Sequence, residues 1–148
     1  MAERHQLVKC PPHKVWRVLA NGDSYAKWVV GTQEILRVDS TWPAVDAELR
    51  FKAGLGPLRI EDSCIVRICE PQQRLELEAV AAPFGTARIA FTLIPWSEDT
   101  LVTLDEHPLL GPGARFYGPI SNRLLHLRNR SLLSNLAQVA VSDEAAES

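Results

Sequence analysis

The most regular feature of this chain is the alternation of apolar and polar residues between Gln33 and Pro108. A period of two is typical of β-strands with one buried and one solvent-facing side. Breaks rich in proline, glycine and acidic residues interrupt the pattern. They divide it into six predicted strands: Glu34–Asp39, Ala47–Ala53, Leu58–Glu70, Arg74–Ala81, Thr86–Pro95 and Leu101–His107. The connections are short, which favours consecutive antiparallel hairpins, because parallel neighbours need long crossovers.

The residues before this region predict one more strand and two short helices. Glu3 to Cys10 alternate as a first strand, which Pro11-Pro12 ends. Pro12 suits the first turn of a helix that continues to Leu19. A second short helix is expected over Tyr25 to Val29, with a capping residue just before it. We expect both helices to support one rim of the sheet.

The alternation sorts the strand residues into two faces. The predicted inner face collects apolar side chains: Leu49, Phe51, Ile60, Cys64, Val66, Ile68, Leu75, Leu77, Ala79, Ala87, Ile89, Phe91, Leu93, Val102 and Leu104. The predicted outer face collects charged side chains: Glu48, Arg50, Lys52, Arg59, Glu61, Arg67, Arg74, Glu76, Glu78 and Arg88. Such an antiparallel sheet has one dry face, and that face needs a cover.

The cover is the C-terminal segment Pro119 to Val141, which predicts one long amphipathic helix. Its main apolar stripe consists of Leu125, Leu132, Leu133, Leu136, Val139 and Ala140. Asn129 lies near the centre, and Leu124 and Leu127 belong to a second apolar patch in the first turns. We interpret this as a helix whose last half seals a core and whose first half roofs a cavity. The second patch could instead form a homodimer contact.

Two carboxylates, Asp62 and Glu106, fall on the inner face by the same parity. An unpaired ionised carboxylate is costly there, so each should gain a partner or a raised pKa. Glu106 could act as a general base or accept a hydrogen bond from a ligand, or it could simply pair with Asn129 or an arginine. A bulge in its long strand would turn Asp62 outward instead.

Several other residues are candidates for a ligand site. Trp28, Phe51 and Phe91 either line a pocket or fill the core, and Cys64, Leu104 and Leu125 face the same space. Trp42 is expected at an exposed rim. The apolar loop from Pro108 to Pro119 carries Tyr117 and is a plausible gate for a cavity mouth.

Composition narrows the class of protein. The 148 residues suit one domain over residues 1–141, with a disordered acidic tail over 142–148. A net charge of −2 argues against nucleic acid binding. Three cysteines without a C-x-x-C pair favour a reducing cytoplasm, and no apolar run is long enough to span a membrane. The four histidines lack metal-ligand spacing, and no phosphate-binding loop is present, so we expect neither metal nor cofactor.

The sequence also resembles the START-like superfamily, in particular its bacterial polyketide cyclase/dehydrase branch, also called SRPBCC. The resemblance rests on Pro12-x-x-x-Val15-Trp16, Tyr25-x-x-Trp28, Trp42-Pro43, Gly56-Pro57-Leu58, Gly85-Thr86-Ala87-Arg88, Thr100-x-Val102-Thr103 with Glu106, Gly111-Pro112 and Arg128-Asn129. It implies an α+β helix-grip fold, in which a seven-stranded curved antiparallel sheet (β-α-α-β6-α) wraps around a long C-terminal helix.

The resemblance further implies a hydrophobic ligand held between the sheet and that helix. Similar proteins include lipid carriers, plant hormone receptors, pollen allergens and polyketide cyclases. We therefore expect binding of a small hydrophobic ligand, aromatic or polyketide-like. The alternatives are a cyclase or dehydratase that uses Glu106, with Asn129 positioning the substrate, and a partner-binding or dimerisation module.

Overall fold

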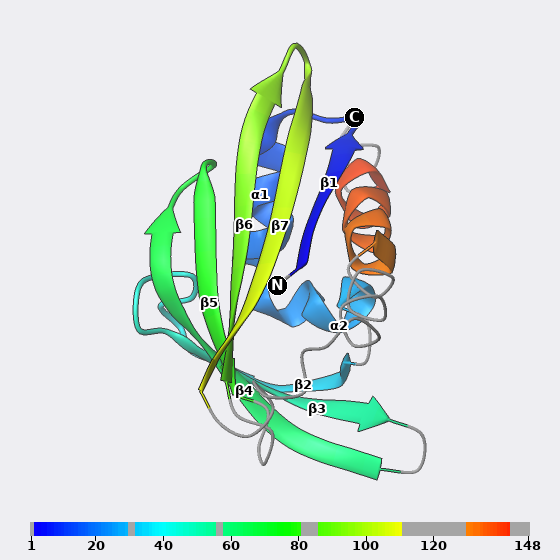
Figure 1. Ribbon diagram of the computed structural model, residues 1–148. Helices are drawn as coiled ribbons and strands as arrows, with labels where there is room; N and C mark the ends of the chain where they lie inside the picture. The colour runs from blue at the N-terminus through cyan, green and yellow to red at the C-terminus, as the bar shows by residue number, and fades with distance from the viewer. Residues whose placement is uncertain (1, 30–31, 56–57, 81–85, 111–129, 143–148) are drawn as a thin grey trace.

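The structure is a computed structural model that describes residues 2–29, 32–55, 58–80, 86–110 and 130–142 (Figure 1). Seven antiparallel strands form one sheet in the order β1-β7-β6-β5-β4-β3-β2. The strands are β1 (Ala2–Val8), β2 (Thr32–Val38), β3 (Glu48–Leu55), β4 (Leu58–Glu70), β5 (Arg74–Val80), β6 (Thr86–Trp96) and β7 (Asp99–Leu110). Strands β2 to β7 follow one another as hairpins, and β1 pairs with β7. The predicted strands and their antiparallel order are thus confirmed.

The short helices lie between β1 and β2 in the sequence. Helix α1 (Pro12–Ala20) buries Val15, Val18 and Leu19, whose spacing of three and four residues gives one apolar side. The 3-10 turn η1 (Gly22–Ser24) and helix α2 (Tyr25–Trp28) follow. In Figure 1, α1 is seen behind β6 and β7. The predicted element order is confirmed up to β7.

The last described element is a helix over residues 130–142. Its buried side chains belong to the same core cluster as the inner face of the sheet: Leu132, Leu133, Leu136 and Ala140. Arg130 and Gln138 are exposed, as the predicted stripe requires. The side-chain amide of Asn135 donates to the carbonyl of Trp28 at 3.4 Å, which ties this helix to α2. Residues 119–129 of the predicted helix lie outside the described residues.

Trp42 was expected at an exposed rim, and this prediction is wrong. Its side chain is buried, and its indole N–H donates to the carbonyl of Leu19 at 3.3 Å. The hydroxyl of Tyr25 donates to the same carbonyl at 2.7 Å. The last carbonyls of a helix lack partners within the helix, so these two aromatic side chains satisfy the end of α1.

Ile68 was expected on the inner face, and this prediction is also wrong. The β4–β5 ladder shifts register between Val66 and Ile68, as at a β-bulge. A bulge reverses the alternation that follows it. Ile68 is therefore exposed, whereas Cys69 is partly buried against the core.

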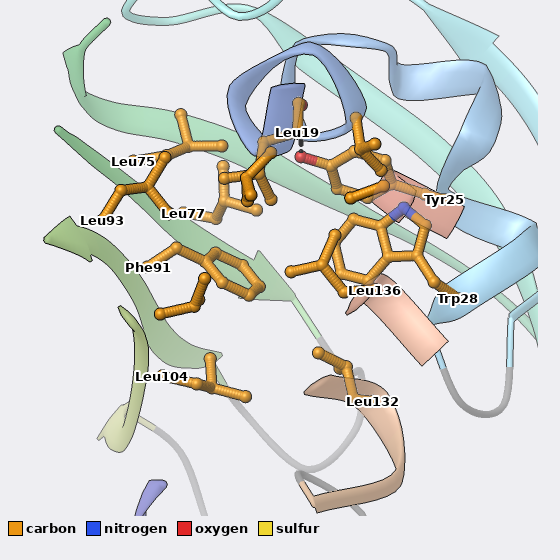
Figure 2. Close-up of a cluster of buried hydrophobic side chains, with 14 of the residues drawn as sticks. Leu19, Tyr25, Trp28, Leu75, Leu77, Phe91, Leu93, Leu104, Leu132 and Leu136 are labelled. Carbon is orange, nitrogen blue, oxygen red and sulfur yellow. Dashed lines mark hydrogen bonds between the residues drawn. The ribbon is translucent and has the colours of Figure 1, made fainter. Parts of the chain in front are cut away.

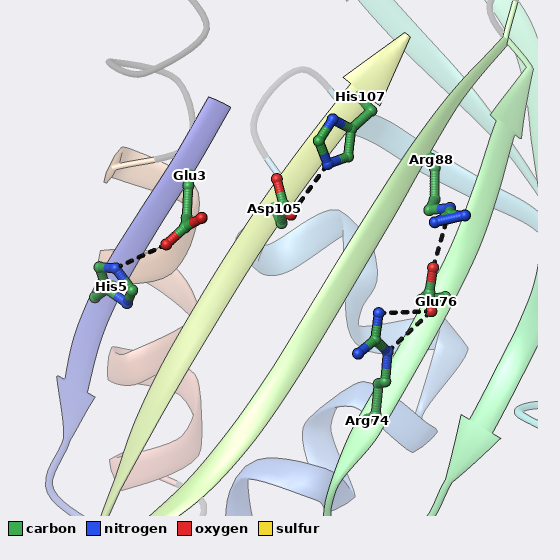
Figure 3. Close-up of polar contacts among 7 residues, drawn as sticks. All are labelled: Glu3, His5, Arg74, Glu76, Arg88, Asp105 and His107. Carbon is green, nitrogen blue, oxygen red and sulfur yellow. Dashed lines mark hydrogen bonds and ion pairs between the residues drawn. The ribbon is translucent and has the colours of Figure 1, made fainter. Parts of the chain in front are cut away.

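The outer face carries a network of ion pairs, shown in Figure 3. Glu76 was expected there as a solvent-facing charge, but its side chain is only 3% exposed. It accepts from Arg74 at 2.8 Å and from Arg88 at 3.1 Å. A buried carboxylate needs such partners. The two arginines therefore explain how the charge of Glu76 can be buried on the solvent-facing side of the sheet.

Candidate functional site

The inner face of the sheet changes character along the strands. One part is fully buried and carries large side chains: Leu49, Val66, Leu75, Leu77, Phe91, Leu93, Val102 and Leu104. The other part combines apolar side chains of different sizes with two carboxylates, and we call it the floor: Phe51, Asp62, Ala79, Ala87, Ile89 and Glu106. Within the floor all residues except Glu106 are partly exposed.

Strand pairing shows that the floor is continuous. Phe51 is paired with Asp62 across β3 and β4, and Ala79 with Ala87 across β5 and β6. Paired residues of antiparallel strands share a face. Cys64 links the two pairs, because it is buried on β4 directly opposite Ala79. The floor therefore crosses the centre of the sheet rather than following its edge.

Asp62 keeps the inward parity that the alternation predicts. The β3–β4 ladder is regular from Glu48 opposite Ile65 to Leu55 opposite Leu58, and the bulge lies beyond it. Asp62 is thus on the same face as the buried Cys64 and is itself half-buried. The sequence left an outward Asp62 open as an alternative, and this register excludes it.

Glu106 lies at the other end of the floor. It is paired with Ile89 on β6 and shares the face of the buried Leu104 two residues earlier. Its side chain is buried, with 4% of the residue exposed. The register puts Glu106 level with Val66, through Ile89 and Leu77, and therefore four residues from Asp62 along β4. At about 4.8 Å per strand spacing and about 3.3 Å per residue, the two carboxylates are on the order of 20 Å apart.

The aromatic candidates Trp28 and Phe91 fill the core beside the floor (Figure 2). Their rings meet edge to face, with centroids 5.8 Å apart. The indole N–H of Trp28 donates to the hydroxyl of Ser24 at 3.3 Å, and the Tyr25 ring packs against the same indole at a tilt of 54°. Since Trp28 and Phe91 are nearly inaccessible, they support the floor from the side. Phe51 is the partly exposed aromatic residue of the three.

Two acidic groups near the floor are held neutral by burial. Burial, and to a smaller extent the nearby Glu48, raises the pKa of the Cys64 thiol to about 12. Burial also raises the pKa of Tyr25 well above its usual value, with Cys64 adding to the effect. A thiolate is the reactive form of cysteine. Cys64 is therefore an apolar wall at neutral pH and not a nucleophile.

Three of the predicted ligand-binding residues, Tyr117, Leu125 and Asn129, lie outside the described residues, as do Leu124 and Leu127. So does the predicted gate beyond residue 110. Conversely, Ala79, Ala87 and Ile89 were placed on the inner face by the sequence but not singled out as site residues. In the sequence, these three residues could have been recognised as site candidates because they are small or medium-sized inward residues on central strands, where the neighbouring inward residues are large.

The described residues contain no group of three histidine, cysteine or acidic side chains that could hold a metal ion. Among the helices of those residues, none is long and apolar enough to cross a membrane.

Comparison with known proteins finds likeness in structure and not in sequence. No protein-family model matches the chain, and no curated protein matches it. NE0264 from Nitrosomonas europaea has 20% sequence identity and a TM-score of 0.75, over 97% of this chain and 95% of that one. Ara h 8.0201 has 9% identity and a TM-score of 0.71, over 95% and 96%.

DynU16, from the dynemicin biosynthetic locus, has 19% identity and a TM-score of 0.67, over 93% of this chain and 45% of that one. At these identities the likeness concerns the fold alone.

Proposed function

We propose that this chain, whose fold is the helix-grip fold of the START-like superfamily, binds a small and largely apolar ligand over the floor. One observation carries the proposal: the inward side chains of Ala79, Ala87 and Ile89 stay partly exposed on central strands. Inward positions at the centre of a sheet are normally covered by the core. Incomplete cover at this place leaves apolar surface for a guest molecule.

The chemistry of the floor favours a ligand with an apolar body and hydrogen-bond donors. Phe51, Ala79, Ala87 and Ile89 offer apolar contacts, with Phe51 available for stacking on an aromatic ring. Carboxylates accept hydrogen bonds when ionised, and Glu106 stands at one end of this surface. The likeness to a protein from a biosynthetic locus supports testing polyketide-like aromatic compounds. A carrier of this kind would suit the cytoplasm, where its three cysteines, which form no disulfide, stay reduced.

The test is to fill the space over the floor with larger side chains. Ala79→Leu and Ala87→Leu should leave the free energy of unfolding within about 1 kcal/mol of wild type if there is room, whereas overpacking a filled core costs about 1–3 kcal/mol. Both variants should weaken binding of the neutral fluorescent probe N-phenyl-1-naphthylamine. Ala137→Leu, at a partly buried alanine of the C-terminal helix, is the matched control. Strong destabilisation together with unchanged probe binding would refute the proposal.

The second candidate is catalysis, and the burial of Glu106 at the end of the floor favours it. A carboxylate beside a bound substrate can remove a proton next to a carbonyl, as enolisation and dehydration require. Glu106→Gln should then retain probe binding and stability while conversion of a polyketide-like substrate, followed by mass spectrometry, is lost. Equal conversion by this variant would remove Glu106 from the mechanism.

A further inference from the structure

The tip of the β6–β7 hairpin presents an exposed tryptophan on the outer face of the sheet. Trp96 is 59% exposed, while the other three tryptophans are buried or half-buried. In Figure 1 the hairpin projects beyond the neighbouring strands at the top of the molecule. An indole costs free energy when left in water, so its position at a projecting tip indicates a contact surface.

Trp96 does not stand alone. Leu7, Leu101 and Ile94 form a row across β1, β7 and β6, because Leu101 is paired with both of the others. Ile94 is exposed and lies two residues before Trp96, hence on the same face. The rest of the described outer face is dominated by ion pairs (Figure 3), so this apolar patch differs from its surroundings.

A hollow of about 390 Å³ opens at the same tip. It is lined by Lys9, Cys10, Pro11, Glu98 and Asp99. Asp99 is paired with Trp96, so the exposed ring and the hollow are neighbours on one end of the sheet. The ammonium of Lys9 lies 3.6 Å from the carboxylate of Asp99, at the rim of the hollow.

The hollow has the chemistry that an indole ring requires. The ring of Pro11 offers an apolar contact, and the Lys9 ammonium can lie over the face of an aromatic ring as a cation–π partner. The carboxylates of Glu98 and Asp99 can accept from an indole N–H.

We propose that this end of the sheet is a homodimer contact, in which Trp96 of each copy inserts into the hollow formed by Lys9, Cys10, Pro11, Glu98 and Asp99 of the other. A twofold axis satisfies both insertions at once, since ring and hollow lie side by side on one chain. Across a twofold axis the Lys9 ammonium of one copy can face the Glu98 carboxylate of the other, whereas an anionic membrane or nucleic acid would meet two carboxylates for one cation. The Leu7, Leu101 and Ile94 row lies at the centre of this contact.

Sedimentation equilibrium over a wide concentration range tests the contact. Wild type should dimerise reversibly, and Trp96→Ser and Lys9→Glu should each raise the dimer Kd by about tenfold or more. Both side chains are exposed, so circular dichroism should show that each variant folds normally. Val45→Ser, at an apolar residue that is 53% exposed elsewhere, is the matched control and should leave the Kd unchanged.

Mixing the Lys9→Glu and Trp96→Ser chains distinguishes the proposed contact from other ways of forming a dimer. The Lys9→Glu chain keeps its tryptophan and the Trp96→Ser chain keeps its hollow, so the mixture should associate more tightly than either variant alone. Acrylamide quenching of tryptophan fluorescence should fall as wild type dimerises, because the most exposed indole becomes covered. A wild type that stays monomeric, variants that dimerise normally, a mixture no tighter than its parts, or capture of monomers by phosphatidylcholine and phosphatidylglycerol vesicles would each overturn the proposal.

Discussion

Leu136→Ala tests whether the C-terminal helix holds the sheet. The side chain of Leu136 is completely buried in the core that the helix shares with α1, α2 and the inner face (Figure 2). The substitution removes three carbons, and at about 0.8 kcal/mol for each buried methylene the transfer loss is roughly 2.4 kcal/mol. The residual cavity adds to this loss, so we expect a total decrease in the free energy of unfolding of about 3–4 kcal/mol.

The assay is urea unfolding followed by circular dichroism. For a chain of this length, the expected loss corresponds to a decrease in Tm of about 10 °C. Val141→Ala is the control, because Val141 lies on the same helix but is exposed, and it should change stability by about 0.5 kcal/mol or less. If both variants lost the same free energy, or if Leu136→Ala lost less than about 1 kcal/mol, the helix would not pack on the sheet as described.

Three further substitutions test local features. Gly22→Ala should cost about 1–3 kcal/mol in urea unfolding, because the added Cβ would lie 2.7 Å from the Cγ1 of Val38. Glu76→Gln should cost about 1–2 kcal/mol, less than a fully buried ion pair, since its two arginine partners are partly exposed and can rehydrate. Cys64 has a pKa of about 12 in the folded chain against 9.0 ordinarily, so the stability it contributes should be present below pH 9 and be lost as pH rises toward 12. Cys64→Ala should flatten that decline in urea midpoints measured across the same pH range.

The fold was predictable because two strong periodicities mark the strands and the described part of the C-terminal helix. The β4 strand begins and ends at the predicted residues, Leu58 and Glu70, and the helix stripe around Leu136 is buried as expected. Both patterns arise because one side of each strand or helix is buried. Whether a residue is apolar or polar therefore indicates which side of its element it lies on. The order of β2 to β7 followed from the short connections between them. The pairing of β1 with β7 joins distant parts of the chain and does not follow from connection length.

The errors have long-range causes that a pattern of neighbours cannot contain. Trp42 was assigned to a rim because Pro43 follows it, but its indole N–H finds a carbonyl 23 residues earlier in the chain, at Leu19. The floor is a similar case. Parity placed Ala79 and Ala87 on the inner face correctly, but whether such a position is covered depends on elements from elsewhere in the chain.

The bulge in β4 gives the two halves of that strand different tasks. Before it, Asp62 and Cys64 face inward and contribute to the floor and its wall. After it, the alternation reverses, so that Cys69 packs toward the core and Ile68 faces outward on the row of Glu76. Had the bulge fallen before residue 62, the same sequence would have turned its carboxylate to solvent and an adjacent side chain inward. The inward direction of Asp62 therefore depends on the position of one extra residue in β4. The sequence left both directions of this carboxylate open, and the strand register decides between them.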